Sequence, residues 1–192
     1  MKTANDNLIS LPNKRLREPS RKVGLISKEI LDIVEKMKEK TLEWEDSRKY
    51  EVGVALAAIQ IDKPYRIIIV RDDFDSKDNR SFTVFINPTI TKYEGKIVED
   101  YEGCLSVTDI YGRVPRYEKV RVKATGLNGK EFRLTATGFL ARVLQHEIDH
   151  VNGKLFIDHI KDNPAAFYKL DSNGQLEELN YEKQIKQSSI LW

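Results

Sequence analysis

The chain has 192 residues, the usual size of one folded domain that buries a substantial core. Its 32 Lys and Arg against 30 Asp and Glu give a formal net charge of +2, too small for nucleic-acid binding through charge alone. No apolar run approaches the roughly 20 residues that span a bilayer, and residues 1–7 lack a signal-peptide core. Together with a single cysteine, this composition predicts one cytoplasmic domain over residues 1–192 without a membrane partner.

The first 25 residues predict an irregular arm, because Pro12 and Pro19 interrupt any helix. Ser27 can cap a helix that runs to about Glu45 and has one apolar face. We expect that face to contain Ile30, Ile33, Val34, Met37 and either Thr41 or Trp44.

Alternating and β-branched residues predict several strands after this helix. We expect them at residues 66–70, 82–86, 89–98 and 120–125. Asn128–Gly129 predicts a hairpin turn into a strand at 132–134, because this pair readily adopts the positive φ of tight turns. Asn173–Gly174 predicts another small hairpin, and residues 181–192 predict a short helix or an extension that packs on the domain.

Residues 52–60 form a run of small and apolar residues that ends in Gln60. Small residues let a substrate backbone approach closely, and the glutamine N–H can stabilise a developing oxyanion. Taken alone, the segment is more typical of a core element.

Cys104 is the only cysteine of the chain and lies in the segment Glu102–Ser106. Without a second cysteine it cannot form an intramolecular disulfide. Its thiol is therefore an inert core group, a nucleophile or a metal ligand.

His146, Glu147 and His150 form an H-E-x-x-H pentapeptide in a chain with only three histidines. On a helix the two imidazoles lie about one turn apart on the same face, where both can bind one metal ion. The glutamate between them can act on a metal-bound water as a general base. Two core histidines with ordinary hydrogen bonds are the alternative interpretation.

The helix around this pentapeptide has one apolar arc, formed by Leu140, Val143, Leu144 and Val151, with Phe139 at its edge. Both histidines and the glutamate point into this arc, where unpaired polar groups are costly and a metal would satisfy them. Arg142, Gln145 and Asp149 point the other way, and we expect Asp149 to face solvent or to orient a neighbour. Thr137 is the expected N-cap and Asn152–Gly153 the expected end. With the Cys104 thiolate, the two imidazoles would form a catalytic ligand set for zinc or ferrous iron with one open position.

Three segments together resemble the peptide deformylases, which carry G-x-G-x-A-A-x-Q, E-G-C-L-S and Q-H-E-x-D-H in that order. Here they are Gly53–Gln60, Glu102–Ser106 and Gln145–His150. Val114–Arg116 and Gly153–Asp158 also look like the family, so the resemblance covers roughly residues 8–160 and leaves 161–192 as a variable extension. Ala55 replaces the second glycine of the first segment. Its methyl group is either tolerated at negative φ or narrows the cleft.

The resemblance implies an α+β fold, with antiparallel sheets packed around the central metal-binding helix and a further helix near the N-terminus. It also implies a metal-dependent amide hydrolase that removes the N-terminal formyl group from formyl-methionyl nascent polypeptides and releases formate. Cys104, His146 and His150 would hold one divalent ion, with Fe(II) expected and Zn(II) or another transition metal as alternatives. Glu147 would move the proton, and the Gln60 amide and Leu105 N–H would stabilise the oxyanion.

By the same resemblance, Val54, Ala55 and Gly103 would flank the substrate backbone. The helical projection adds Phe139 and Val143, which share the histidine arc, as contacts for the methionine side chain. His159 lies outside the motif and is expected to be an ordinary histidine. The translating ribosome is a candidate partner.

Two alternatives remain at this point. The pentapeptide also permits a metallopeptidase that cleaves internal peptide bonds, although the thiolate ligand argues against it. The other alternative is a metal-containing module that binds formyl peptides but has lost turnover through Ala55.

Overall fold

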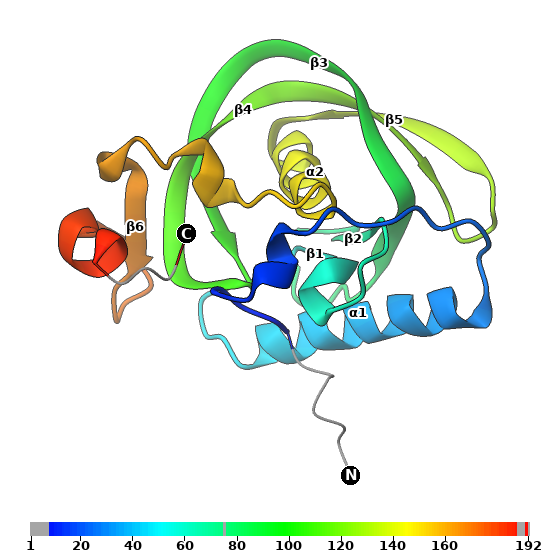
Figure 1. The fold of residues 1–192 in the computed structure, drawn as a ribbon, viewed down its shortest axis with the longest axis horizontal. Helices are drawn as coiled ribbons and strands as arrows, with labels where there is room; N and C mark the ends of the chain where they lie inside the picture. The colour runs from blue at the N-terminus through cyan, green and yellow to red at the C-terminus, as the bar shows by residue number, and fades with distance from the viewer. Residues whose placement is uncertain (1–7, 75, 188–190, 192) are drawn as a thin grey trace.

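The computed structural model describes residues 8–74, 76–187 and 191 (Figure 1). Within them, seven strands pair antiparallel in one sheet of order β1-β2-β3-β4-β6-β7, and β5 pairs with β4 beside this path. The two α-helices are α1 Lys28–Asp46 and α2 Gly138–Val151. The strands are β1 Ala55–Ala57, β2 Ile67–Arg71, β3 Phe82–Cys104, β4 Val107–Thr125, β5 Glu131–Thr137, β6 Phe167–Leu170 and β7 Leu176–Glu178. Short turns of 3-10 helix are η1 Lys14–Arg17, η2 Ala58–Ile61, η3 Phe156–His159 and η4 Pro164–Ala166, and η5 Glu182–Lys186 is a π-helical turn.

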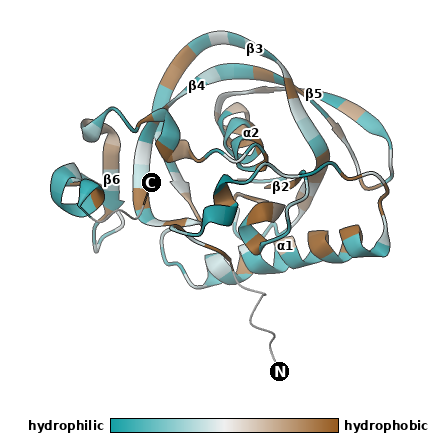
Figure 2. Ribbon diagram, in the orientation of Figure 1, coloured by the Kyte–Doolittle hydropathy of each residue, from teal (hydrophilic) through white to brown (hydrophobic). Residues whose placement is uncertain are grey.

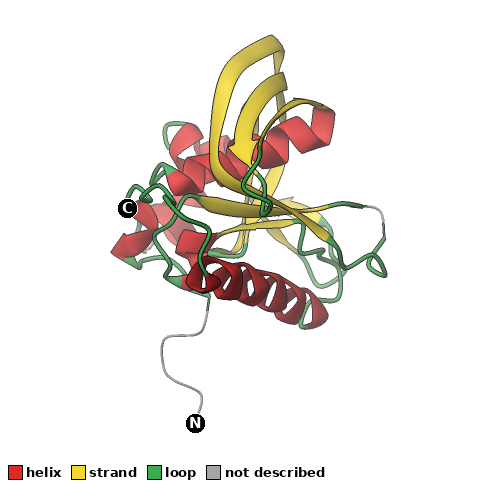
Figure 3. Cartoon of the chain, turned by 90° about the vertical axis from the view of Figure 1, so that its right-hand side faces the viewer, coloured by secondary structure: helices red, strands yellow, loops and turns green. Residues whose placement is uncertain are grey.

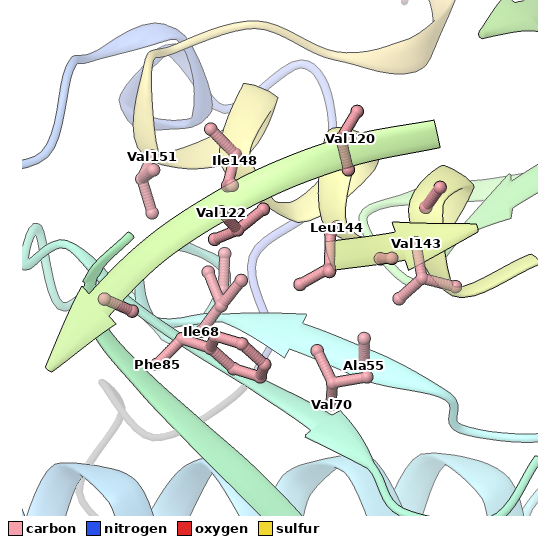
Figure 4. Close-up of a cluster of buried hydrophobic side chains, with 14 of the residues drawn as sticks. Ala55, Ile68, Val70, Phe85, Val120, Val122, Val143, Leu144, Ile148 and Val151 are labelled. Atoms are coloured by element: carbon pink, nitrogen blue, oxygen red, sulfur yellow. The ribbon is translucent and has the colours of Figure 1, made fainter. Parts of the chain in front are cut away.

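Strand β2 is buried on both faces, which explains its uninterrupted run of apolar residues. Ile67 and Ile69 belong to the cluster that contains the apolar face of α1, and Ile68 and Val70 belong to the cluster around α2. Figure 4 shows this second cluster, in which side chains of the sheet meet the apolar arc of α2. The sheet is therefore sandwiched between the two helices.

The long β3–β4 hairpin arches over α2 (Figures 1 and 3). Four shifts of register interrupt its pairing, and such shifts bend and twist a strand pair. Because this arch covers the helix, every residue from Ala141 to Val151 except Asp149 is buried. The side of α2 that carries Arg142 and Gln145 is thus enclosed rather than exposed.

The expected α+β class and both helices are confirmed. Helix α1 buries the predicted face. Of the two residues offered for its last position, Thr41 is buried and Trp44 is half-buried, and Glu45 is buried as well. Figure 2 shows the hydrophobic and hydrophilic residues interspersed along α1, as expected for a helix with one buried face.

Two predicted strand boundaries were wrong. Residues 82–86 and 89–98 belong to one strand. Asn87, between them, has a φ of 52°, and a shift in register between Ile86 and Thr89 accommodates it without ending the strand. Strand β4 begins at Val107 rather than near Val120.

The C-terminal predictions can be compared with the described residues. The hairpin around Asn173–Gly174 is present as β6–β7. Ile185 and Leu191 are buried in a common cluster with β6, which confirms a packing role for this part of the tail, while 188–190 and 192 lie outside the description. Residues 1–7 of the predicted N-terminal arm also lie outside it. Among the described residues, no helix has the length and apolarity to span a membrane.

Candidate metal centre

The end of β3 and the helix α2 bring Cys104, His146 and His150 together. One ligand atom from each of the three lies within 4.8 Å of the others, and Cys104 Sγ is 3.2 Å from His150 Nε2. The histidines are one helical turn apart, as the pentapeptide predicts, and the arch of β3 delivers the thiol to them. The structure therefore contains the predicted metal-site triad.

Several side-chain atoms around this triad fit a divalent ion. His146 Nδ1 is 2.9 Å from Glu102 Oε2, which leaves Nε2 as the ring nitrogen available to a metal. In the described part of the chain, His150 Nδ1 and Glu147 Oε2 are buried without a hydrogen-bond partner. Buried polar atoms are nearly always satisfied, so the unpaired Glu147 oxygen fits a water molecule held at the centre. A thiolate and two imidazoles would also supply three protein ligands and leave one position open, as catalytic zinc sites do.

Glu102 forms the centre of a buried network of charges beneath the triad. Arg116 donates to both of its carboxylate oxygens at 2.9 and 3.1 Å, and Arg142 donates at 2.8 Å. Burial alone would raise the pKa of Glu102, but the hydrogen bond with His146 and the Arg116 guanidinium hold this pKa well below its usual range. A permanent carboxylate thus fixes the orientation of the His146 ring.

Asp149 connects this network to the surface. Its Oδ2 accepts from Arg116 Nη1 at 2.5 Å and lies 2.7 Å from His159 Nε2. The expectation that Asp149 orients a neighbour is confirmed, and His159 is a partly exposed histidine with partners outside the triad. Gln145 connects α2 to the β3–β4 hairpin, because its amide donates to Tyr117 O at 2.8 Å and accepts from Tyr117 N at 3.1 Å.

Burial shapes the protonation of the remaining groups on α2. The side chain of Glu147 is buried, and burial raises its pKa to about 7. Burial, and then the nearby His146, hold the pKa of His150 well below its usual value. Burial alone would also lower the pKa of His146, but its hydrogen bonds with Cys104 and Glu102 raise that pKa, and metal binding would release the proton. A carboxyl group with a pKa near neutrality can both accept and return a proton.

Gln60 follows β1 in the turn η2 and is buried at the rim of the triad. Its Oε1 accepts from Ala57 N at 2.9 Å, which fixes the orientation of the amide. Its Nε2 donates to Ser106 Oγ at 3.1 Å and lies 3.6 Å from Cys104 Sγ. The amide N–H group is thus directed toward the metal ligands.

The segment before Gln60 is positioned by α1. Gly53 lies so close to this helix that a Cβ atom there would be 2.7 Å from Thr41 Cγ2. Its N–H donates to Glu45 Oε2 at 2.8 Å, and Glu45 in turn forms a buried ion pair with Arg71. Ala55 lies in the extended strand β1, a conformation open to any residue, so its methyl group causes no backbone strain.

A cleft of about 340 Å³ opens beside the triad, a volume in the range of small-ligand sites. Except for His150, all the predicted site residues line it: Val54, Ala55, Gln60, Gly103, Cys104, Leu105, Phe139, Val143, His146 and Glu147. Residues 52–60 are therefore both a core element and a wall of the cleft. Gly103 allows the Tyr111 ring to approach, because a Cβ atom there would be 2.6 Å from Tyr111 Cε1.

Sequence reasoning missed several residues around this cleft. Glu102, Arg116 and Arg142 gave no signal of a shared network, although the first two lie in segments that resemble the family. The outer wall also includes Trp44, Tyr50, Tyr101, Tyr111, Leu170 and Leu176, which belong to no motif.

Comparisons with known proteins agree with this site. The model of the polypeptide deformylase family matches residues 6–165. The chain is 39% identical over 157 residues to peptide deformylase 1 of Pseudomonas syringae pv. tomato, covering 81% of this chain and 87% of the relative. It is 40% identical over 154 residues to the peptide deformylase of Agrobacterium fabrum, covering 80% of this chain and 85% of the relative.

Solved structures give the same result. The peptide deformylase of Synechococcus elongatus in complex with actinonin is 34% identical with a TM-score of 0.70, and the match covers 80% of this chain and 77% of that one. The peptide deformylase of Legionella pneumophila is 38% identical with a TM-score of 0.70, covering 80% and 84%. The sequence segments, the triad and these relatives agree, and the chain belongs to the peptide deformylase family.

Proposed function

We propose that this chain hydrolyses the N-terminal formyl amide of formyl-methionyl peptides and releases formate. The observation that carries the proposal is the triad Cys104, His146 and His150 beside a cleft that Glu147 and Gln60 line. Fe(II) is the proposed ion, and Zn(II) or another transition metal would suit the same donors. When bound, the ion supplies a Lewis acid and lowers the pKa of a water ligand.

Glu147 is the proposed general acid–base. One of its carboxylate oxygens is buried without a partner in the described structure, and its pKa is raised to about 7. At neutral pH it can therefore accept a proton from the attacking water and return it to the leaving amine. His146 and His150, which precede and follow it on the same helix, would hold the metal.

Gln60 and Leu105 are the proposed donors to the oxyanion. The Gln60 amide is held by Ala57 and Ser106 with its N–H group toward the ligand side of the cleft. Leu105 follows the Cys104 ligand directly and lines the cleft, where its backbone N–H is the second proposed donor. Donors fixed before the reaction stabilise developing negative charge without reorganising.

The substrate backbone is proposed to run between Val54 and Ala55 on one side and Gly103 on the other. Phe139 and Val143 line the cleft from α2 and offer an apolar contact for the methionine side chain. Phe139 is half-exposed and packs edge-on against Phe74, with ring centroids 5.0 Å apart. We further propose that the enzyme acts in the cytoplasm on chains emerging from the translating ribosome.

The test is formate release from formyl-Met-Ala-Ser by protein purified without oxygen, with the bound metal measured in the same sample. Acetyl-Met-Ala-Ser and unformylated Met-Ala-Ser serve as matched substrates. Formate release from the formyl peptide, with no acetate released from the acetyl peptide, would support the proposal. Cleavage of the Met–Ala bond would indicate a metallopeptidase instead, and binding without formate release would indicate a module that has lost turnover. Actinonin, bound in the Synechococcus elongatus relative, should compete with the formyl peptide.

A further inference from the structure

The β6–β7 hairpin forms part of the outer wall of the cleft and lies beyond residue 165, where the family match ends. Leu170 and Leu176 are directly opposite each other in the register of this hairpin. Both are half-buried and both line the same cleft as the triad. Two adjacent leucines on a short surface hairpin thus face the site rather than the core.

The two faces of the hairpin have different roles. Phe167 is buried and packs against Tyr181, with ring centroids 5.1 Å apart. Because side chains alternate along a strand, Tyr168 and Leu170 point to the opposite face. Lys169 and Glu177 form an ion pair at 2.9 Å on the side away from the leucines. The alternation of side chains along the two strands therefore places the leucines together on the face toward the cleft.

The hairpin is fixed against the rest of the cleft. Strand β6 pairs with β4 through Tyr168 and Tyr111, and Figure 1 shows it beside the lower part of β4. The Tyr168 ring packs edge-on against Tyr101 with centroids 5.0 Å apart. The turn fits closely against Tyr50, since a Cβ atom on Gly174 would be 2.6 Å from Tyr50 Cγ. These contacts make the leucines a wall of defined position.

The chemistry of this wall is apolar and aromatic. Tyr50, Tyr101 and Tyr111 line the cleft together with the two leucines. Among the charged groups nearby, Glu51 accepts a hydrogen bond from the Tyr111 hydroxyl, and Arg142 is held by Glu102 and backbone carbonyls. Glu51 also lies 3.7 Å from Arg48, so both charges already have partners of opposite sign. An aliphatic or aromatic side chain would bury apolar surface here.

We propose that Leu170 and Leu176 form a subsite for an apolar side chain at the second or third position of the substrate. This inference rests on the proposed function, in which the formyl group lies at the triad and the methionine side chain contacts Phe139 and Val143. The following residues must leave through the remaining cleft, which the hairpin lines on one side. The C-terminal extension thereby makes the enzyme selective for the sequence after the formyl-methionine.

The first test compares kcat/KM for formyl-Met-Ser-Ser-Gly, formyl-Met-Leu-Ser-Gly and formyl-Met-Ser-Leu-Gly. We expect one leucine peptide to exceed the all-serine peptide by about tenfold, as expected for burying part of a leucine side chain. In Leu170→Ser/Leu176→Ser this ratio should fall to near one. Leu127→Ser, an exposed leucine at the β4–β5 turn, is the matched control and should keep the wild-type ratio.

A second variant separates recognition from a merely structural role. Leu176→Lys should lose the preference for leucine and prefer a peptide with aspartate at the same substrate position. Misfolding cannot produce such a gain in kcat/KM for the aspartate peptide. If all three peptides release formate at equal kcat/KM in the wild type, the subsite proposal is wrong while the proposed function stands. An unchanged leucine preference in both variants would likewise overturn it. No formate release from any peptide would instead overturn the proposed function.

Discussion

Glu102 Oε2 lies 2.9 Å from His146 Nδ1, although the two residues are 44 positions apart in the chain. The carboxylate also receives hydrogen bonds from Arg116 and Arg142, so its own position is fixed on three sides. A group that orients a metal ligand in this way affects metal affinity without touching the metal.

Glu102→Gln should therefore weaken metal binding by about 10-fold to 100-fold, the usual effect of losing a partner of a ligating histidine. The dissociation constant can be measured by competition with a chelator. Glu99→Gln, an exposed carboxylate on the same strand, is the control. Equal affinity in the wild type and Glu102→Gln would show that Glu102 has no part in orienting His146.

Replacing any triad residue should abolish stable metal binding, because three protein ligands leave no substitute. Cys104→Ala, His146→Ala and His150→Ala should each lose most bound metal in elemental analysis. His159→Ala removes the histidine outside the triad and should retain the metal. Full occupancy in Cys104→Ala would exclude the thiolate as a ligand.

Glu147→Gln should separate chemistry from metal binding. The amide keeps the shape of the side chain but cannot accept a proton, so turnover should fall by about 10²-fold to 10⁴-fold. Formate release and metal content are to be measured on the same preparation. Near-normal turnover with full metal would mean that another group moves the proton.

Gln60→Ala should lower kcat by about 10²-fold or more with little change in KM, because the lost donor acts mainly in the transition state. Ser106→Ala removes an acceptor that orients the same amide, at 3.1 Å, and should give a smaller loss of the same kind. Metal content should be unchanged in both. A raised KM with intact kcat would make Gln60 a ground-state binding residue instead.

The buried pair Glu45 and Arg71 predicts a dependence of stability on pH. Burial alone would raise the pKa of Glu45, but hydrogen bonds from Arg71 and the Gly53 N–H lower it in the folded state. A depressed carboxyl pKa adds stability above the unfolded pKa of about 4.3, and this contribution is lost as the pH falls through the lower, folded pKa.

Glu45→Gln should accordingly be less stable than the wild type at pH 7 by about 3 kcal/mol, the lower range for disrupting a buried ion pair. The difference should shrink below about pH 4, where the Glu45 carboxyl begins to protonate in the unfolded chain before it does so in the folded one. Urea unfolding at both pH values measures it, with the exposed Glu39→Gln on the same helix as control. A difference in the free energy of unfolding that does not vary with pH would contradict a lowered pKa of Glu45 in the folded state.

The parts of the fold that depend on local pattern could be predicted from the sequence. Helix α1 repeats its apolar residues with the helical period, and α2 carries both this period and the ligand spacing. Residues 89–98 could be predicted as a strand, but the continuation of β3 to Cys104 could not, because residues 99–101 are all exposed and show no alternation of buried and exposed positions.

The site divides along the same line. Cys104, His146 and His150 follow from residue types that few structural roles require, and Gln60 follows from its segment. Leu170 and Leu176 reach the cleft only because β6 pairs with β4, a contact between distant residues that no local pattern encodes. Arg142 and Gln145 point away from the apolar arc yet are buried, since the arch encloses that side too.

The enclosure of α2 has a consequence for how the chain can vary over evolution. Helix α1 has a solvent-facing side. Most substitutions on such a side change the free energy of unfolding by less than about 0.5 kcal/mol. From Ala141 to Val151 almost every side chain meets either the core or the charged network, and truncation of a large apolar one would cost about 2–5 kcal/mol. Substitutions on the outer side of α1 should therefore be tolerated, whereas substitutions in α2 should require compensating changes in the arch that surrounds it.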